Sequence, residues 1–196
     1  MAVRTGKQMK KFSCVQGCSD CCIYREYYPA VEYGKIGVLL LPEEKAAIEV
    51  LARKMNLSVK IIPRLAIGNE FPEKVIAYQM MGKNDDGDLC PFLDVESNGR
   101  SPHGGFNCSI YPERPLACRA YPVIDAGKKK TLDDHCQFCK KFSTTEVSSE
   151  GLQGEIEALT KIKTGVTAGK SHVWRYATAT GKAGDVMLPE GWVAES

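Results

Sequence analysis

The sequence predicts an α+β fold: a small, irregular domain of short strands and helices, followed by a C-terminal helix and an extended tail. The cysteines are the first reason, because the chain has 9 of them in 196 residues, in a dense block near the N-terminus and in scattered positions much further along. The apolar stretches between them are the second reason, since they are short and mixed in periodicity. No internal repeat is present, so the chain does not predict a regular array of strands and helices.

The composition is that of an ordinary globular protein. Apolar residues make up 43% of the chain and charged residues 26%. The net charge of +2 is too small to predict nucleic-acid binding, and the basic runs at residues 7–11 and 128–130 are short enough to be solvated surface. No apolar run approaches the ~20 residues of a membrane-spanning helix. The basic N-terminus leads into cysteines without a secretory apolar segment, so we expect a cytoplasmic protein that binds neither nucleic acid nor membrane.

The first predicted elements are a strand and a helix in direct succession. Residues 36–41, IGVLLL, are apolar enough for a buried strand. Pro42 fits the first helical turn, and the acids Glu43 and Glu44 follow it. Apolar residues then recur at helical spacing, which predicts a helix over residues 42–56.

Two further strands and a turn are predicted before the next cysteine. Residues 59–62 and 74–81 have strand composition. The polar run NDDGD at residues 84–88 is a turn signal, which would bring Cys90 back beside the preceding strand.

A second helix and a tail are predicted after the last cysteine. Apolar residues at helical spacing predict a helix over residues 149–163. The tail after Thr164 lacks periodicity, and its candidate anchors are Trp174, Tyr176, Met187, Leu188 and Trp192. We therefore divide the chain into a cysteine-cluster domain, residues 1–145, and a C-terminal helix and extended tail, residues 146–196, packed on the same domain.

The cysteines are predicted to bind metal rather than to form disulfides. A cytoplasmic location keeps thiols reduced, and an odd total of 9 would leave one thiol unpaired. The neighbours Cys21 and Cys22 could pair only with strain. A long stretch without cysteine separates Cys22 from Cys90, so a shared site would couple metal binding to folding. The predicted domain is therefore metal-organised.

The segment YPERPLACRAYP around Cys118 carries a second signal. Pro115 suits the start of a short helix and Pro122 stops it. Cys118 would then lie within a turn of the helix N-terminus, where the backbone dipole favours a thiolate. Arg114 and Arg119 flank it, either in surface salt bridges or as charges that offset a thiolate-bound metal group. We take both arginines as candidate cofactor contacts.

Four blocks in order resemble a known family. CVQGCSDCC, CPFLD, CSIYPERPLACRAYP and a closing Cys136 are similar to the CxxCxxCC family of zinc- or iron-chelating domains, often called YkgJ-like and related to a domain of flagellin lysine N-methylases. The resemblance covers roughly residues 12–139 and implies metal chelation. The ligands that it implies are Cys14, Cys18, Cys21, Cys22, Cys90, Cys108, Cys118 and Cys136. The family often continues its last cysteine as Cys-Pro-Gly, whereas this chain reads CQFC, so Cys139 replaces or supplements Cys136.

Iron–sulfur and zinc remain alternatives. Both accept four thiolates, and eight cysteines divide into two such sites. A zinc domain typically has paired CxxC knuckles, which occur here only at Cys136–Cys139 and within the dense block. We therefore favour an iron–sulfur cluster, one or two of the 4Fe-4S type, over zinc. Adjacent Cys21 and Cys22 project differently, so they serve different sites or only one of them is a ligand.

Two other chemistries are weighed and set aside. The spacing of Cys14, Cys18 and Cys21 also occurs in radical S-adenosylmethionine enzymes, but this chain is short for their barrel. It also lacks the barrel's strand–helix rhythm. His103 and His135 lie near cysteines, yet with enough thiols present we expect them to be exposed or hydrogen-bonded; His172 is not expected to bind metal.

Three classes of function follow. The favoured class is an iron–sulfur protein that acts as an electron-transfer or accessory module, for which we expect a protein partner. The second is a structural zinc-binding module for protein interaction. The third, a metal-dependent protein-modifying enzyme, rests on analogy with the flagellin methylase alone, so the sequence leaves open whether the chain is an enzyme.

Overall fold

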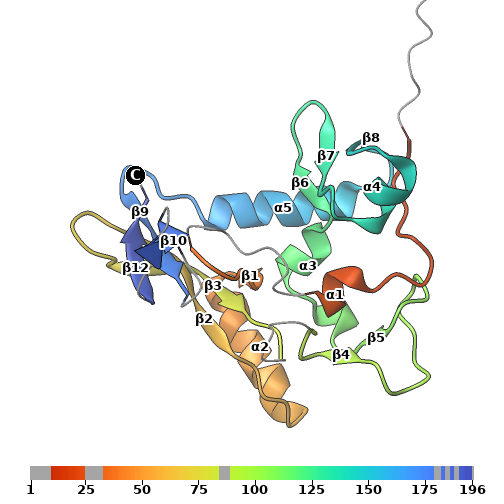
Figure 1. The fold of residues 1–196 in the computed structure, drawn as a ribbon, viewed down its shortest axis with the longest axis horizontal. Coiled ribbons are helices and arrows are strands. Elements are labelled where there is room, and N and C mark those ends of the chain that lie inside the picture. Colours follow the sequence, from red (N-terminus) through yellow and green to blue (C-terminus); the bar gives the residue numbers. More distant parts are fainter. Residues whose placement is uncertain are drawn as a thin grey trace, which may run out of the picture.

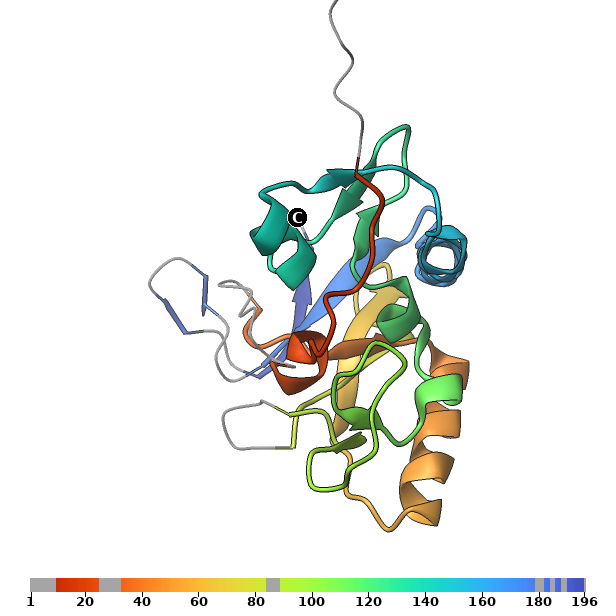
Figure 2. The ribbon, with the colours of Figure 1, turned by 90° about the vertical axis from the view of Figure 1, so that its right-hand side faces the viewer.

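The computed structural model describes residues 10–24, 33–83, 89–178, 182–183, 186–187 and 190–195. Short helices and strands alternate irregularly along the chain, in one larger sheet and several small ones. The predicted α+β fold class is therefore confirmed. Figures 1 and 2 show the larger sheet on one side of the molecule and the short cysteine-bearing elements on the other.

The larger sheet is antiparallel and has the strand order β1–β3–β2–β9–β12. Its strands are β1 (Val38–Leu40), β2 (Ile61–Gly68), β3 (Lys74–Met80), β9 (His172–Ala177) and β12 (Gly191–Ala194). The predicted strands at 36–41, 59–62 and 74–81 all appear. The second runs on to Gly68, which Pro63 concealed in the sequence, since proline usually marks a strand edge or a bulge.

The helix α2 (Pro42–Lys54) confirms the predicted helix. Pro42 occupies the first helical turn, and Arg53 and Lys54 occupy the last turn, where the dipole favours positive charge. The Glu44 carboxylate accepts the backbone N–H of Leu41 at 2.9 Å and also that of Leu116 at 2.7 Å. One acid of the first turn therefore joins α2 to the helix that carries Cys118.

The cysteine-bearing part of the chain consists of very short elements. The helices are α1 (Asp20–Ile23), the 3-10 turn η1 (Tyr111–Glu113), α3 (Leu116–Ala120) and α4 (Gln137–Phe142). The strands are β4 (Leu93–Asp94), β5 (Asn107–Cys108), β6 (Val123–Asp125), β7 (Lys130–Leu132) and β8 (Glu146–Val147). Strands β4 and β5 form one ladder, and β6, β7 and β8 form another. The sequence analysis predicted only α3 among these elements, because pieces this short carry no readable period.

Two apolar cores underlie these elements. The first core contains Leu40, Ile48, Met80 and Phe92, so it lies between the sheet, α2 and the β4 region. The second core contains Leu132, Phe138, Val147 and Leu152, so it lies between the β6–β8 ladder, α4 and the start of α5. Cys90 belongs to the first core and Cys139 to the second. Cys22, Cys108 and Cys118 pack against the first core, and Cys136 packs against the second.

The helix α5 (Gln153–Gly165) corresponds to the second predicted helix but begins later, after the turn at Ser149–Leu152. The tail does not simply extend: β9 pairs with β2, and β12 pairs with β9, where Trp192 lies opposite Tyr176. Along the chain, β9 and β12 are separated by a short hairpin of β10 (Lys182–Ala183) and β11 (Val186–Met187). The predicted anchor Leu188 and the predicted turn at 84–88 lie outside the described residues.

Among the described helices, none is long and apolar enough to cross a membrane.

Candidate metal centre

Backbone hydrogen bonds fasten the N-terminal cysteine segment to distant parts of the chain. The Gly17 N–H donates to the carbonyl of His103 at 2.8 Å, and the Cys90 N–H donates to the carbonyl of Cys22 at 2.7 Å. The Leu89 N–H donates to the carbonyl of Ile23. The long stretch between Cys22 and Cys90 is thus closed by main-chain contacts, as the sequence analysis expected of a shared site.

The loop before Cys108 approaches the N-terminal segment closely. The buried Ser19 hydroxyl accepts the backbone N–H of Phe106 at 2.7 Å. A Cβ on Gly105 would collide with the Cys18 carbonyl and with the Ser19 hydroxyl. Gly105 is therefore required where the two cysteine blocks meet, because a side chain there would push them apart.

The helix α4 is fastened to the same segment. The Gln137 side-chain amide donates to the Asp20 carboxylate at 2.5 Å, which joins α4 to α1. The Ser148 N–H donates to the carbonyl of Lys10 at 3.0 Å, and the Phe12 ring packs edge-on against Phe138, 5.1 Å between centroids. All four cysteine blocks therefore meet around α1, between α3 and α4 (Figure 2).

Four cysteines associate with the first core, and we call them the inner group: Cys22, Cys90, Cys108 and Cys118. All four line one cavity of about 460 Å³, as does Cys21. Cys90 is only 4% exposed. The ladder β4–β5 places Cys108 opposite Leu93, whose N–H donates to the carbonyl of Cys90. Cys22 of the N-terminal block thus lines the same cavity as three cysteines that lie much further along the chain.

The other four cysteines lie toward the second core, and we call them the outer group: Cys14, Cys18, Cys136 and Cys139. Cys136 packs against this core and Cys139 is part of it, whereas Cys14 is exposed. Cys136 is the residue just before α4, and Cys139 lies on the helix within its first turn.

The pKa values of two outer thiols are raised, mainly by burial. Partial burial, followed by the charges of Cys18, Cys136 and Cys22, raises the pKa of Cys14 from 9.0 to about 11. Burial, followed by the charges of Cys136 and Asp133, raises the pKa of Cys139 to about 11. These two thiols are therefore protonated at neutral pH, because burial disfavours the charged thiolate and the neighbouring negative charges add to that cost.

The pKa of Cys108 in the inner group is also raised. Burial is the main cause, Cys22 and Cys90 add to it, and the Arg114 guanidinium opposes it. Arg114 lines the cavity, lies over the Tyr111 ring at 3.6 Å and donates to the Tyr111 carbonyl at 2.9 Å. These contacts hold its charge beside the inner thiols, and its contact with a cofactor stays a prediction.

The Cys118 segment has the predicted local structure. Pro115 caps α3 and Tyr121 ends it before Pro122, so Cys118 is the third residue of the helix. The Glu44 carboxylate accepts the Leu116 N–H, so one of the backbone N–H groups in the first turn of α3 already has a hydrogen-bond acceptor within the protein. Arg119 is exposed and is not among the residues that line the cavity, so its contact with a cofactor stays a prediction.

The spacing of the thiols discriminates between kinds of metal group. One zinc ion with four thiolates needs sulfur atoms about 3.8 Å apart, because tetrahedral Zn–S bonds are about 2.3 Å long. The sulfurs of Cys21 and Cys22 lie 4.0 Å apart, but within the described ranges no three thiols lie within 4.8 Å of one another. The donor set fits zinc or iron chemically, and its spacing is wider than a single ion requires.

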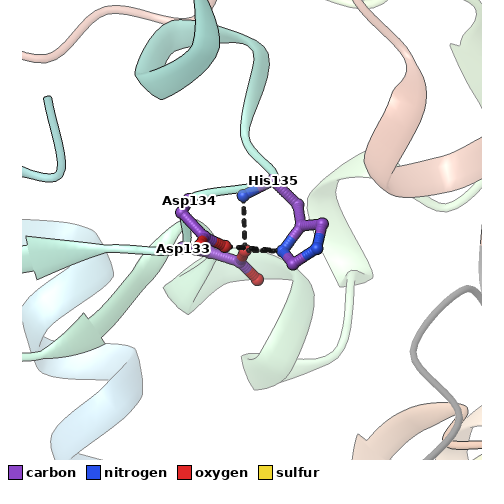
Figure 3. A group of neighbouring side chains, drawn as sticks. All are labelled: Asp133, Asp134 and His135. Carbon is purple, nitrogen blue, oxygen red and sulfur yellow. Dashed lines mark hydrogen bonds and ion pairs between the residues drawn. The ribbon is translucent and has the colours of Figure 1, made fainter. Parts of the chain in front are cut away.

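The histidines near the cysteines are engaged in other contacts. The His103 Nε2 lies 3.0 Å from the Cys18 carbonyl and 3.3 Å from the Ser101 hydroxyl. His135 Nδ1 lies 3.2 Å from Asp133 and 2.6 Å from Asp134, in an exposed group beside Cys136 (Figure 3). His172 is exposed on β9, away from the cysteine blocks. His103 and His135 are therefore hydrogen-bonded or ion-paired in the structure, and the assignment of the ligands to thiols stays a prediction.

Sequence reasoning missed several residues that build the centre. Ser19, Asp20 and Gly105 were not predicted to take part in it. The glycine pair in SPHGGFNC beside a cysteine was the available signal, since glycine often marks a close backbone approach. The contact between Asp20 and Gln137 joins residues far apart in the chain, and no local pattern announces it.

A comparison with protein-family models finds one match. The model is described as "CxxCxxCC: Putative zinc- or iron-chelating domain", and it spans residues 13–140, which include all nine cysteines. No match is found among curated proteins or among solved structures.

Proposed function

Because the chain belongs to the CxxCxxCC family of zinc- or iron-chelating domains, we propose that it is an iron–sulfur protein that passes electrons to or from a protein partner. Metal binding itself follows from the family. The observation that supports iron–sulfur clusters is the arrangement of eight thiols in two adjacent groups whose sulfurs are spaced more widely than one ion requires.

The wide spacing favours a cluster because of how a cluster is bound. In a 4Fe-4S cluster each thiolate binds a different iron atom, so the four sulfurs surround a body much larger than one ion. The cavity of about 460 Å³ beside the inner group provides such space. A zinc site would require the thiols of a group to converge further.

The proposed ligands divide as the two groups do. Cys22 belongs with the inner group because its carbonyl accepts the Cys90 N–H and its side chain packs against the first core. Cys21 is then the ninth thiol and not a required ligand. This division answers the question raised by the adjacent pair, since two neighbouring residues need not share one cluster.

The chain's own residues would prepare both groups for anionic clusters. Burial raises the pKa of Cys108 in the inner group and of Cys18 in the outer group, and the positive charges of Arg114 and Lys140, respectively, oppose that rise. The buried Phe92 and Phe138 exclude water beneath the two groups. A bound cluster would supply reversible one-electron transfer, and burial with nearby positive charge would tune its potential.

The outer group is the proposed point of contact with the partner. Cys14 is exposed there, and the exposed lysines Lys10, Lys140 and Lys141 lie on the adjoining surface of the N-terminal segment and α4. A partner with an acidic surface would be steered to this side, and its association rate would fall with salt.

The test is anaerobic purification of the full chain, followed by metal and sulfide analysis. We expect a brown protein with absorbance near ~400 nm and about eight iron and eight sulfide per chain, the content of two 4Fe-4S clusters. Dithionite should bleach the colour reversibly. A colourless protein that holds two zinc ions and no sulfide would replace this proposal with the structural zinc module.

A further inference from the structure

Arg64 occupies an irregular position in the larger sheet. Along β2, Pro63 lies opposite Tyr78 and Leu65 lies opposite Ala77, so Arg64 between them has no partner residue on β3. Such a β-bulge adds one residue to a strand, redirects its side chain and is often found beside binding sites. The bulge therefore makes Arg64 a candidate binding residue.

The charge of Arg64 is not neutralised within the described part of the chain. Its Nη1 donates to the Gly37 carbonyl at 3.3 Å, and it takes part in no ion pair with a described carboxylate. Burial and the nearby Arg175 lower its pKa to about 10. Arg175 donates two hydrogen bonds to the Glu195 carboxylate, at 2.8 and 2.6 Å. Glu195 therefore pairs with Arg175 and not with Arg64. A sheltered guanidinium with one neutral acceptor is costly unless an anion completes its contacts.

Two hollows meet at Arg64. A small one of about 30 Å³ is lined by Lys35, Arg64, Arg175 and the Gln79 amide, and no described carboxylate lines it. The large cavity of about 460 Å³ extends from Arg64 past Val38, Met80 and Ile110, toward the inner cysteines. The small hollow thus offers positive charge, and the large one offers apolar walls.

We propose that these hollows form a binding site for an organic anion, a carboxylate or phosphate group carried on an apolar body, with the anionic group at Arg64. The planar fork of a guanidinium matches both oxyanions, and its contacts are strengthened where water is scarce. The apolar body would lie along β1 and β3 toward the inner group. A cavity of this size, largely apolar with a few converging polar groups, is typical of small-molecule sites.

This inference does not depend on whether the thiols hold iron or zinc. Arg64 is on β2 and belongs to none of the cysteine blocks, although it lines the same cavity as the inner thiols, and its charge would serve the ligand in either case. A variant that loses anion binding but keeps its metal would show that the anion site and the metal centre are independent. A variant that loses its metal but still binds the anion would show the same.

The first experiment measures binding to the full, metal-loaded protein by calorimetry. The probes are octanoate, octyl phosphate, octan-1-ol, acetate and inorganic phosphate. We expect both alkyl anions to bind at least tenfold more tightly than the neutral alcohol of the same chain length. We also expect each to bind at least tenfold more tightly than its short counterpart, acetate or inorganic phosphate. The better alkyl anion identifies the preferred head group. Equal binding of octanoate, octyl phosphate and octan-1-ol would overturn the proposal without any variant.

The second experiment removes the charge. Arg64→Gln should reduce binding of the better alkyl anion at least tenfold while leaving the alcohol within a factor of two. Arg64→Lys, which keeps a positive charge but not the fork, should lie between the two. Arg53→Gln, which removes an exposed arginine at the end of α2, is the matched control and should bind as the wild type does.

Metal content and thermal midpoint are measured on every variant. If Arg64→Gln keeps its metal and still binds the anion as tightly as the wild type, Arg64 is not the anion site. If Arg64→Gln does not fold, Arg64→Lys decides: unchanged affinity for both head groups would contradict a role for the guanidinium fork.

Discussion

The inner and outer cysteine groups have the same number of thiols but different surroundings. The inner group lies on the core shared by the sheet and α2, and one of its thiols, Cys90, is held by main-chain hydrogen bonds at both its N–H and its carbonyl. The outer group lies on the small core under α4. Its Cys14 is exposed, and Cys18 and Cys136 are half-buried.

The difference indicates a division of labour. The inner group faces a cavity lined by Arg64 and Arg114, whose walls are mostly apolar. The outer group is reached from the surface and is held together by one segment and one short helix. We therefore expect the outer metal to exchange and react first, and the inner metal to be retained longest.

Removal of metal from both groups should produce the largest effect. The thiols then repel or protonate, and we expect the free energy of unfolding to fall by at least about 4 kcal/mol, the linkage value for a ligand at a thousand times its Kd. Hydrogen exchange should show lost protection at the amides of Gly17 and Cys90, with the β2–β3 amides retained. Unchanged protection and stability after complete chelation would mean that metal does not organise the domain.

Core substitutions should separate the two groups. Phe138→Ala and Phe92→Ala each remove a ring that is almost fully buried, and each should cost about 3–5 kcal/mol. Phe138→Ala should deplete the outer metal and Phe92→Ala the inner metal, because each ring supports its own group. Phe71→Ala, at an exposed position, is the control and should change neither stability nor metal content. Equal depletion of both groups by either core variant would contradict their independence.

Alkaline pH should weaken the metal-free protein through the outer group. The pKa of Cys14 and of Cys139 is about 11 in the folded chain against 9.0 for the model thiol, so folding favours the protonated thiols. That contribution to stability is complete below about pH 9 and is lost as the pH rises toward about 11. Urea unfolding of the metal-free chain at several pH values measures it. The double variant Cys14→Ser/Cys139→Ser should show a shallower decline, and an identical decline would refute this cause.

The smallest effect is expected from the hydrogen bond between Ser19, in the N-terminal cysteine block, and Phe106, in the loop before Cys108. Ser19→Ala leaves the Phe106 N–H without its acceptor and should cost about 1–3 kcal/mol, with faster metal loss on chelator challenge. Ser97→Ala, in an exposed loop, should stay within about 0.5 kcal/mol of the wild type. Chelator kinetics equal to those of the wild type would show that this hydrogen bond does not hold the blocks together.

Much of the fold was predictable where local rules apply. Pro42 with two acids announced α2, and Pro115 and Pro122 framed α3 around Cys118. The cysteine blocks identified the family and metal binding, and the charge flanking Cys118 identified Arg114. These signals are local, so the sequence carries them without knowledge of the tertiary structure.

The remainder depends on contacts between distant residues. The pairing of β9 with β2 brings the tail into the main sheet, although the tail itself has no period. The division of the cysteines depends on which core lies beneath each block, and the sequence spacing of Cys21 and Cys22 does not encode it. Arg64 was not singled out, because a bulge is defined by the register of the partner strand and not by its own sequence.

The most direct test of two separate groups is the metal and sulfide content of three single variants purified anaerobically under identical conditions. Cys118→Ser should lose the inner half of the metal, Cys136→Ser should lose the outer half, and Cys21→Ser should retain both. Loss of all metal from both Cys118→Ser and Cys136→Ser would indicate one shared site. Full retention by Cys118→Ser, or a loss from Cys21→Ser as large as from Cys118→Ser, would contradict the division proposed for the inner group.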